Sequence, residues 1–181
     1  MLFLRDILKK MPKNKIAIIY GSDTGATENV ANLLIEKIKP LDVDLLDVSN
    51  LSPDDFLKYD IIIMGIPTWY IGELQSDWDY FFPKFKEIDF TGKKTAFFGL
   101  GDQLGYPDSF VDGIGILAEV VLKNGGEVFG YWSVEGYDFD ESLGVAPNGN
   151  FYGLVLDDDN EHEMTDERVD KWFNQIKDHL N

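Results

Sequence analysis

Short apolar runs alternate with amphipathic stretches along most of the chain. The runs Lys15–Tyr20, Ile61–Gly65 and Thr95–Leu100 are almost continuously apolar, which predicts strands that are buried on both faces. The run near Val43–Val48 is more polar, as expected of a strand at the edge of a sheet. Helical patterns separate these strands, and strands that alternate with helices form parallel sheets. The pattern therefore predicts an α/β fold with a doubly wound, five-stranded parallel sheet and helices on both faces.

The predicted helices are marked by caps, prolines and apolar stripes. The first helix follows Gly21–Thr27 and ends at Pro40, the second begins at Ser52–Asp55, and the third lies near Asp77–Phe85. The fourth helix runs from about Phe110 to Asn124. The last helix ends the chain and carries one apolar stripe, formed by Val169, Trp172, Phe173, Ile176 and Leu180. The fifth strand has two candidates, Glu127–Trp132 and Phe151–Leu156. A turn-rich segment, residues 133–150, separates them.

The loop after the first strand has the chemistry of a phosphate site. It reads Gly21–Thr27, offers three hydroxyl groups and bare backbone N–H groups, and opens directly into a helical pattern. Helix N-termini of this kind bind phosphate. The loop has neither the lysine of a GxxxxGK[ST] triphosphate site nor the GxGxxG pattern of a dinucleotide site. It therefore fits a single buried phosphate monoester bound by Ser22, Thr24 and Thr27, although a turn that only caps the helix has a similar composition.

Two further loops follow strands, and each carries a large aromatic residue. Pro67–Trp78 contains Trp69, and Gly101–Asp108 contains Tyr106. Ligands of open parallel sheets bind outside the carboxyl ends of the strands, where all three loops meet. A core position is the alternative for Trp69, but a loop between a proline and a glycine favours a ligand contact. One phosphate and one flat ring between the two aromatic residues indicate flavin mononucleotide (FMN). The tryptophans assigned to the core are Trp78, Trp132 and Trp172.

These residues carry a resemblance to the long-chain flavodoxins. The phosphate loop, Pro67–Trp78, Leu100–Tyr106 and Leu154–Asn160 match the motifs of the family in order, and the likeness runs from Lys15 to the C-terminus. It implies the strand order 2-1-3-4-5, with FMN at the carboxyl edge of the sheet. It also implies that residues 133–150 are an insertion that splits strand five, either as a passive surface loop or as part of a partner-docking surface.

The resemblance implies a cofactor site made from all three loops and one acidic residue near the last helix. Its residues are Ser22, Asp23, Thr24, Gly25, Ala26, Thr27, Pro67, Thr68, Trp69, Tyr70, Ile71, Gly72, Leu100, Gly101, Asp102, Tyr106, Ser109 and Asp159. Trp69 and Tyr106 are expected to cover the two faces of the flavin. Asp102 is expected to lie by the pyrimidine side of the flavin. The alternative is that Asp102 only caps its own loop.

The chain departs from the common family pattern near the expected flavin. Threonine, asparagine and glutamine are frequent in the family where Leu100, Ser109 and Val111 stand, so fewer polar side chains would meet the pyrimidine edge. Residues 69–72 resemble a turn whose Tyr70–Ile71 peptide rotates on reduction, from a type I-like to a type II-like form. The second form asks for a positive φ at Ile71, which strains a β-branched residue.

The function implied by the resemblance is one-electron transfer between redox proteins. The flavin would cycle between semiquinone and hydroquinone at low potential, and the chain would be a carrier, not an enzyme, with no catalytic residue. A reductase of the ferredoxin–NADP type is the expected partner. The alternative is an NAD(P)H-dependent FMN quinone reductase, which needs an open flavin face. A flavin-free interaction module leaves Trp69 and Tyr106 unexplained.

Composition further narrows the class of protein and the kinds of partner that this chain can have. The chain has 181 residues, no cysteine, two histidines and a formal net charge of −17. Without cysteine it forms neither disulfides nor thiolate metal or iron–sulfur sites, and no metal is expected. The charge argues against nucleic acid and anionic membranes. Residues 131–170 contain twelve acidic residues and one basic residue, which indicates a solvated acidic face, a surface steered toward basic partners, or both. No run approaches the roughly 18 apolar residues of a transmembrane helix. The implied carrier is expected to be a cytoplasmic monomer.

One domain is predicted for residues 15–181. Residues 1–14 lie outside the pattern, and their run Leu2-Phe3-Leu4, interrupted by Arg5, is too short for the core of a signal peptide. They are either an upstream mis-start ahead of Met11 or a small amphipathic helix.

Overall fold

The apolar runs of the sequence form the central sheet of the computed structural model, which describes residues 14–181. β1 (Ile16–Tyr20), β3 (Ile61–Trp69) and β5 (Lys94–Leu100) lie in its middle, and β2 (Val43–Asp47) and β6 (Glu127–Val128) lie at its edges. The order is β2-β1-β3-β5-β6 with parallel neighbours throughout, as the doubly wound prediction requires. The predicted extension, residues 1–14, lies outside the described residues apart from its last one.

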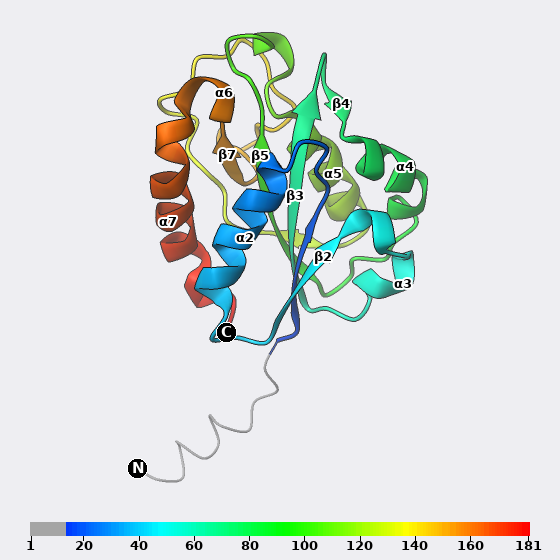
Figure 1. The fold of residues 1–181 in the computed structure, drawn as a ribbon. Helices are drawn as coiled ribbons and strands as arrows, with labels where there is room; N and C mark the ends of the chain where they lie inside the picture. The colour runs from blue at the N-terminus through cyan, green and yellow to red at the C-terminus, as the bar shows by residue number, and fades with distance from the viewer. Residues whose placement is uncertain (1–13) are drawn as a thin grey trace.

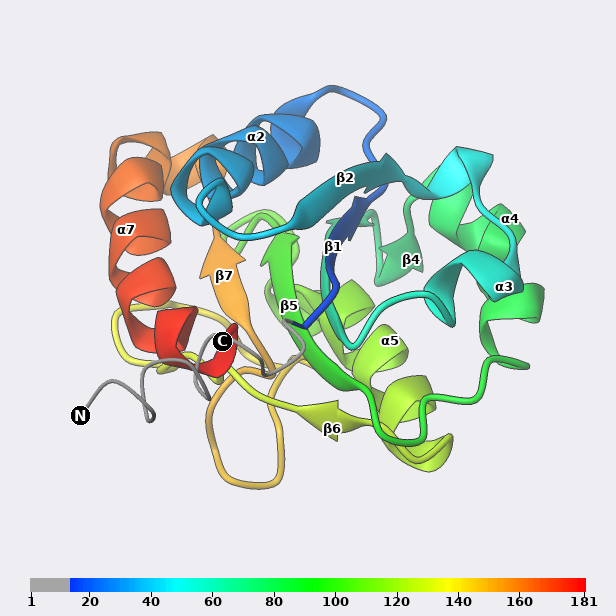
Figure 2. The same ribbon diagram turned by 90° about the horizontal axis from the view of Figure 1, so that it is seen from below.

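Helices cover both faces of the sheet. They are α2 (Ala26–Ile38), α3 (Pro53–Phe56), α4 (Ser76–Phe85), α5 (Asp112–Lys123), α6 (Asp158–Glu161) and α7 (Thr165–Ile176), with short 3₁₀ turns η1 (Val48–Asn50), η2 (Pro107–Ser109), η3 (His162–Met164) and η4 (Lys177–His179). α2 and α7 lie together on one face, and α3, α4 and α5 lie on the other (Figures 1 and 2). The sheet is therefore a middle layer between two layers of helices.

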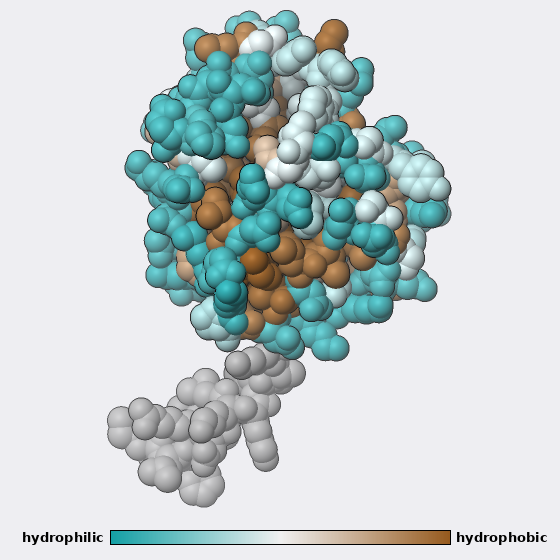
Figure 3. All heavy atoms as spheres, in the orientation of Figure 1, coloured by the Kyte–Doolittle hydropathy of each residue, from teal (hydrophilic) through white to brown (hydrophobic). Residues whose placement is uncertain are grey.

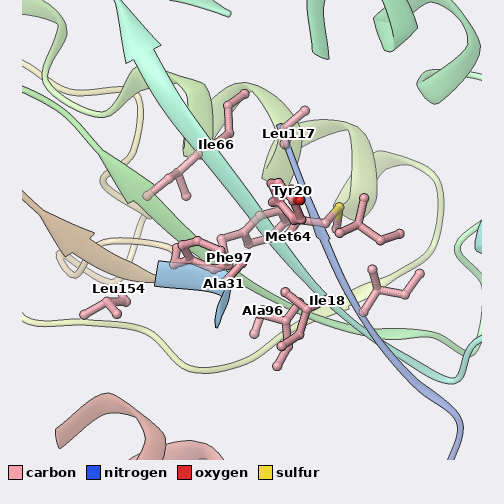
Figure 4. Close-up of a cluster of buried hydrophobic side chains, with 14 of the residues drawn as sticks. Ile18, Tyr20, Ala31, Met64, Ile66, Ala96, Phe97, Leu117 and Leu154 are labelled. Atoms are coloured by element: carbon pink, nitrogen blue, oxygen red, sulfur yellow. The ribbon is translucent and has the colours of Figure 1, made fainter. Parts of the chain in front are cut away.

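The hydrophobic core lies on both sides of the central strands. Ile18 of β1, Met64 of β3 and Phe97 of β5 are completely buried and gather with residues of α2 and α5 (Figure 4). Each such side chain stabilises the fold by about 1.5–3 kcal/mol relative to an exposed position. The tryptophans predicted to be in the core, Trp78, Trp132 and Trp172, are all buried.

β2 lies at one edge of the sheet, as its polar pattern predicts. It pairs with one strand, β1, and its residues are half-buried or exposed. In the space-filling view, hydrophobic residues show through in the middle of the face near this strand, between hydrophilic neighbours (Figure 3). No helix within residues 14–181 combines the length and the apolar character needed to cross a bilayer.

The third strand is longer than its apolar run indicates. β3 continues past Gly65 to Trp69, and β4 (Glu73–Leu74) turns back against it in an antiparallel hairpin, with Trp69 opposite Glu73. The turn between them is Tyr70–Gly72, and Gly72 has the positive φ of +79° that such a short connection needs. Residues 67–69, predicted as part of a loop, therefore belong to a strand that holds them rigidly.

The fifth strand is split as predicted, although both halves are short. β6 pairs with the start of β5, and β7 (Leu154–Leu156) pairs with its end, at Phe98–Leu100. Neither half extends to Trp132 or Phe151, because Gly130 at φ +78° bends the chain away and those two residues bridge each other instead. Residues 133–150, called the insertion below, lie between the halves.

Candidate functional site

A pocket of about 270 Å³ opens where the chain leaves the carboxyl ends of β1, β3 and β5, at the top of the molecule in Figure 1. Its lining residues come from the phosphate loop, the β3–β4 hairpin, the loop after β5 and the start of α6. They are Thr24, Ala26, Thr27, Pro67, Thr68, Trp69, Tyr70, Leu100, Gly101, Asp102, Tyr106, Asp158 and Asp159. The three loops that the sequence singles out therefore share one pocket.

The phosphate loop ends in a glycine that starts a helix. Gly25 has φ +90° and is the N-cap of α2, and its amide N–H donates to Ser22 Oγ at 3.0 Å. This arrangement leaves the first turn of α2 pointing its N–H groups toward the pocket. Thr27, in that turn, is buried, and its Oγ1 has no hydrogen-bond partner within residues 14–181. A buried hydroxyl without a partner costs about 1–3 kcal/mol, which an incoming anion would recover.

Asp23 is directed away from this opening. Its Oδ1 accepts hydrogen bonds from Ser76 Oγ at 2.6 Å and from Gln75 Nε2 at 2.9 Å. Burial raises the pKa of Asp23, but these hydrogen bonds outweigh it and hold the pKa below its usual value. Gln75 is fully buried, and its Oε1 accepts the backbone N–H of Trp78. The loop is thus fastened to the start of α4, and the negative charge is taken up there.

The hairpin supplies the aromatic side of the pocket. Trp69 and Tyr70 have ring centroids 6.1 Å apart, and the indole Nε1 of Trp69 is buried without a hydrogen-bond partner among the described residues. Tyr70 has φ +45°, which is uncommon for a residue that carries a side chain. The type I-like form expected of this turn is therefore wrong, because it would need a negative φ at Tyr70. In the three-residue connection of this hairpin the strained residue is Tyr70, and the strain expected at Ile71 after rotation of the Tyr70–Ile71 peptide stays a prediction.

The third loop is organised by Asp102. Its Oδ1 accepts the N–H groups of Gly105 at 2.7 Å and Leu104 at 3.1 Å, and also Asn160 Nδ2 at 2.8 Å. The hydrogen bond from Gly105 is the main reason that the pKa of Asp102 lies below its usual value. Asp102 therefore caps its own loop and also lines the pocket, so both interpretations of this residue hold.

Two more carboxylates reach the pocket from α6. Burial, and then the nearby charge of Asp102, raises the pKa of Asp159. Asp158 also lines the pocket and accepts a hydrogen bond from Thr165 Oγ1 at 2.5 Å. The sequence analysis missed Asp158, and the run of three aspartates at 157–159 was the signal for it. These acids give one end of the pocket a negative field.

The insertion packs against the third loop. The backbone N–H of Asp138 donates to Gln103 Oε1 at 2.6 Å, and those of Asp140 and Glu141 donate to the carbonyl of Pro107 at 2.9 and 3.0 Å. The Tyr137 hydroxyl donates to the carbonyl of Val155 at 2.6 Å. The insertion is thus more than a passive surface loop, because it fixes the backbone that carries Asp102 and Tyr106.

Most of the predicted cofactor residues line the pocket, and the remainder belong to the same loops without lining it. The residues in this second group are Ser22, Asp23, Gly25, Ile71, Gly72 and Ser109. Ser22 and Asp23 hold the phosphate loop in shape, and Ser109 Oγ lies 3.5 Å from the carbonyl of Tyr70. Their assignment as ligand contacts stays a prediction. Leu100, where the family often has threonine, lines the pocket with an apolar side chain.

The pocket offers two buried donors that have no partner within the described residues, a helix N-terminus and three aromatic rings, those of Trp69, Tyr70 and Tyr106. A family model described as Flavodoxin matches residues 18–172 of the chain. The chain belongs to the flavodoxin family. It is 49% identical over 164 residues to a flavodoxin of Synechocystis, a match that covers 90% of this chain and 96% of that relative. It is 44% identical over 163 residues to flavodoxin 1 of Escherichia coli, with 90% and 93% covered.

Solved structures agree with this membership. The crystal structure of Fusobacterium nucleatum flavodoxin bound to flavin mononucleotide superimposes with a TM-score of 0.87 at 33% identity, and it covers 93% of this chain and 99% of that chain. The fold implied by the resemblance, with five parallel positions and a split last strand, is confirmed by the sheet order. A flavodoxin fold places its ligand at the carboxyl edge where the strand order reverses, which is where this pocket lies.

Proposed function

We propose that the chain carries electrons, one at a time, through bound FMN. The observation that carries this proposal is the pairing of two orphaned donors in one pocket, Thr27 Oγ1 and Trp69 Nε1, each buried and without a partner in residues 14–181. A phosphorylated aromatic ligand satisfies both groups. Membership of the flavodoxin family and a relative solved with flavin mononucleotide support the choice of FMN.

The residues of the chain divide the work of binding. The hydroxyls of Thr24 and Thr27 and the first N–H groups of α2 hold the phosphate without a basic residue, as neutral donors at a helix N-terminus can. Trp69 and Tyr106 enclose the ring. Bound FMN supplies one-electron redox chemistry, which none of the side chains of this cysteine-free protein provides.

The acidic end of the pocket lowers the reduction potential of the bound flavin. Asp102, Asp158 and Asp159 disfavour added negative charge nearby, and low local dielectric strengthens that effect. A reduced, negatively charged ligand is therefore less stable here than in water, so the protein is a strong reductant. It is an electron-transfer protein rather than an enzyme. A quinone reductase is not favoured, because it needs an open ring face, and aromatic residues from two loops line the same pocket, which supports cover on both faces of the ring.

The partners in this proposal are redox proteins with a basic face, among them a reductase of the ferredoxin–NADP type. Ile71, Leu104 and Tyr70 are 83%, 61% and 60% exposed beside the pocket. Exposed apolar groups within an acidic surround suit a transient, steered encounter. Charges more than about 10 Å apart are screened at 0.1 M ionic strength, so transfer from a reductase should slow as salt increases. A rate that is flat from low to moderate salt in stopped-flow measurements would refute the steering.

The proposed function is tested with the purified full chain. We expect one FMN per chain, a yellow protein, reduction in two separate one-electron steps, and no oxidation of NADPH without a reductase. Release of FAD on denaturation, or steady turnover of NADPH with a quinone, would overturn the proposal. A monomeric state and a cytoplasmic location belong to the same proposal, and light scattering and cell fractionation test them.

A further inference from the structure

One buried carboxylate lies behind the pocket and is not explained by ligand binding. Asp112 is the first residue of α5 and is only 8% exposed. Its Oδ1 accepts the backbone N–H of Leu143, in the insertion, at 2.7 Å. A buried charge is costly unless its oxygens are hydrogen-bonded, and this bond satisfies one of the two.

The other oxygen of Asp112 faces the turn of the β3–β4 hairpin. A Cβ atom on Gly72 would lie 2.7 Å from Asp112 Oδ2, closer than real contacts allow. Gly72 follows Tyr70 and Ile71 directly, and Tyr70 lines the pocket in a strained conformation at φ +45°. The carboxylate thus touches the insertion on one side and, on the other, the turn that positions a pocket residue.

The same two segments are joined at a second point. The N–H of Gly113 donates to Thr68 Oγ1 at 2.9 Å, so the start of α5 is also fixed to the end of β3. The base of the hairpin is therefore anchored by a hydrogen bond that does not involve the Asp112 carboxylate. The strained Tyr70 is the part of the turn that has most to gain from moving.

We propose that Asp112 is a positioning residue of the flavin pocket, whose carboxylate couples the insertion to the turn Tyr70–Gly72 and so sets the environment of the bound ring. The inference rests on the proposed FMN site. The titratable and charged residues on the segments packed against α5, or on α5 itself, are Glu73 of β4, Lys94 of β5, Asp108 of η2, Glu119 and Lys123 of α5, Glu127 of β6, and Glu135, Tyr137, Asp138, Asp140 and Glu141 of the insertion. Burial is the main reason that the pKa of Asp112 is raised, and the charge of Glu141 adds to it. The hydrogen bond from Leu143 acts in the opposite direction but does not outweigh burial.

The decisive variant is Asp112→Asn, because it keeps an acceptor for Leu143 and neutralises the group that faces Gly72. Its matched control is Asp108→Asn, which removes the same charge from an exposed residue of the neighbouring turn η2. In the FMN-free protein, amide NMR resonances of Gly72 and Leu143 should titrate together with one midpoint above the usual range of aspartate. Both titrations should vanish in Asp112→Asn and persist in Asp108→Asn.

The loaded protein gives the second measurement. Loss of the charge should make reduction easier, so at pH 8 Asp112→Asn should favour the reduced state three- to tenfold, or about 28–59 mV at 59 mV per decade. This difference should shrink as pH falls through the pKa of Asp112, where the wild type is also neutral. A Leu143 amide that titrates while Gly72 does not, or potentials within twofold of wild type at every pH, would leave Asp112 as an anchor of the insertion only. Failure of the wild type to bind FMN would instead defeat the proposed function.

Discussion

The two ends of the pocket are built in opposite ways. The phosphate end is one continuous loop, residues 21–27, and its left-handed residue is Gly25 at φ +90°. The ring end is assembled from the hairpin, the loop after β5 and α6, and its left-handed residues include, besides Gly72 at φ +79°, two that carry side chains, Tyr70 at φ +45° and Val111 at φ +51°. Glycine adopts this conformation freely, whereas other residues are strained by about 1–3 kcal/mol. The phosphate end is local and relaxed, and the ring end is strained and held by distant contacts.

Charge separates the two ends as clearly as conformation does. The only acid of the phosphate loop, Asp23, is engaged by Gln75 and Ser76, away from the opening. At the ring end, Asp102 and Asp159 both line the pocket. We infer that the phosphate end supplies affinity through neutral donors, while the ring end sets the potential at some cost in stability.

The largest expected effect is at the phosphate end, in Thr27→Val. The valine keeps the shape and removes the orphaned hydroxyl, which would bond to a charged phosphate. Such bonds contribute about 1.5–3 kcal/mol, so the dissociation constant for FMN should rise roughly 10- to 150-fold. Riboflavin has no phosphate, and its binding should not change. Fluorescence titration of the FMN-free protein with both ligands measures the two constants.

Two controls accompany that variant. The FMN-free Thr27→Val protein should be as stable as wild type or slightly more stable, because it loses only an unpaired buried hydroxyl. Thr24→Val should act in the same direction with a smaller effect, since Thr24 is exposed. Equal losses of FMN and riboflavin binding would show that this loop does not hold the phosphate.

At the ring end, Trp69→Leu should weaken both ligands together. Stacking of a base on an aromatic side chain contributes about 1–3 kcal/mol, so the dissociation constants for FMN and riboflavin should both rise roughly 5- to 150-fold. The same titrations measure it, with Trp172→Phe as a control in a buried tryptophan far from the pocket. A loss confined to FMN would mean that the indole serves the phosphate through Nε1 and not the ring.

The same contrast explains what the sequence could predict. The phosphate loop is seven consecutive residues between a strand and a helix, so its composition alone indicated its chemistry. The ring end could not be predicted in the same way. β4 has two residues and no pattern of its own, so the sequence predicts a loop where the hairpin holds Trp69. Asp112 and Leu143 are 31 residues apart, and no local signal joins them.

Strain at the ring end should appear as lost stability. Tyr70→Asn places a residue that tolerates the left-handed region at φ +45°, and the FMN-free protein should gain about 0.5–1 kcal/mol. The matched control is Ile71→Asn, next in the chain, which is 83% exposed and lacks a positive φ, so it should change stability by less than about 0.5 kcal/mol. Urea unfolding measures both. Equal changes in the two variants would place the strain elsewhere.

The smallest expected effect is on the pH dependence of stability, and it distinguishes two acids of the ring end, Asp102 and Asp159. Because the pKa of Asp159 is raised by burial and then by Asp102, its ionisation opposes folding, and stability is lost as pH rises through that pKa. Asp159→Asn should therefore be more stable than wild type at pH 7, by less than about 1 kcal/mol at this exposed site, with no difference below about pH 3.5. Asp102 has a lowered pKa through Gly105, so its contribution is present above pH 4 and is lost on acidification. Asp102→Asn should be less stable at pH 7, and unfolding of the FMN-free variants at both pH values decides the signs. If the free energy of unfolding changes in the same direction in both variants at pH 7, the hydrogen bonds to Asp102 do not make the two carboxylates act oppositely on stability.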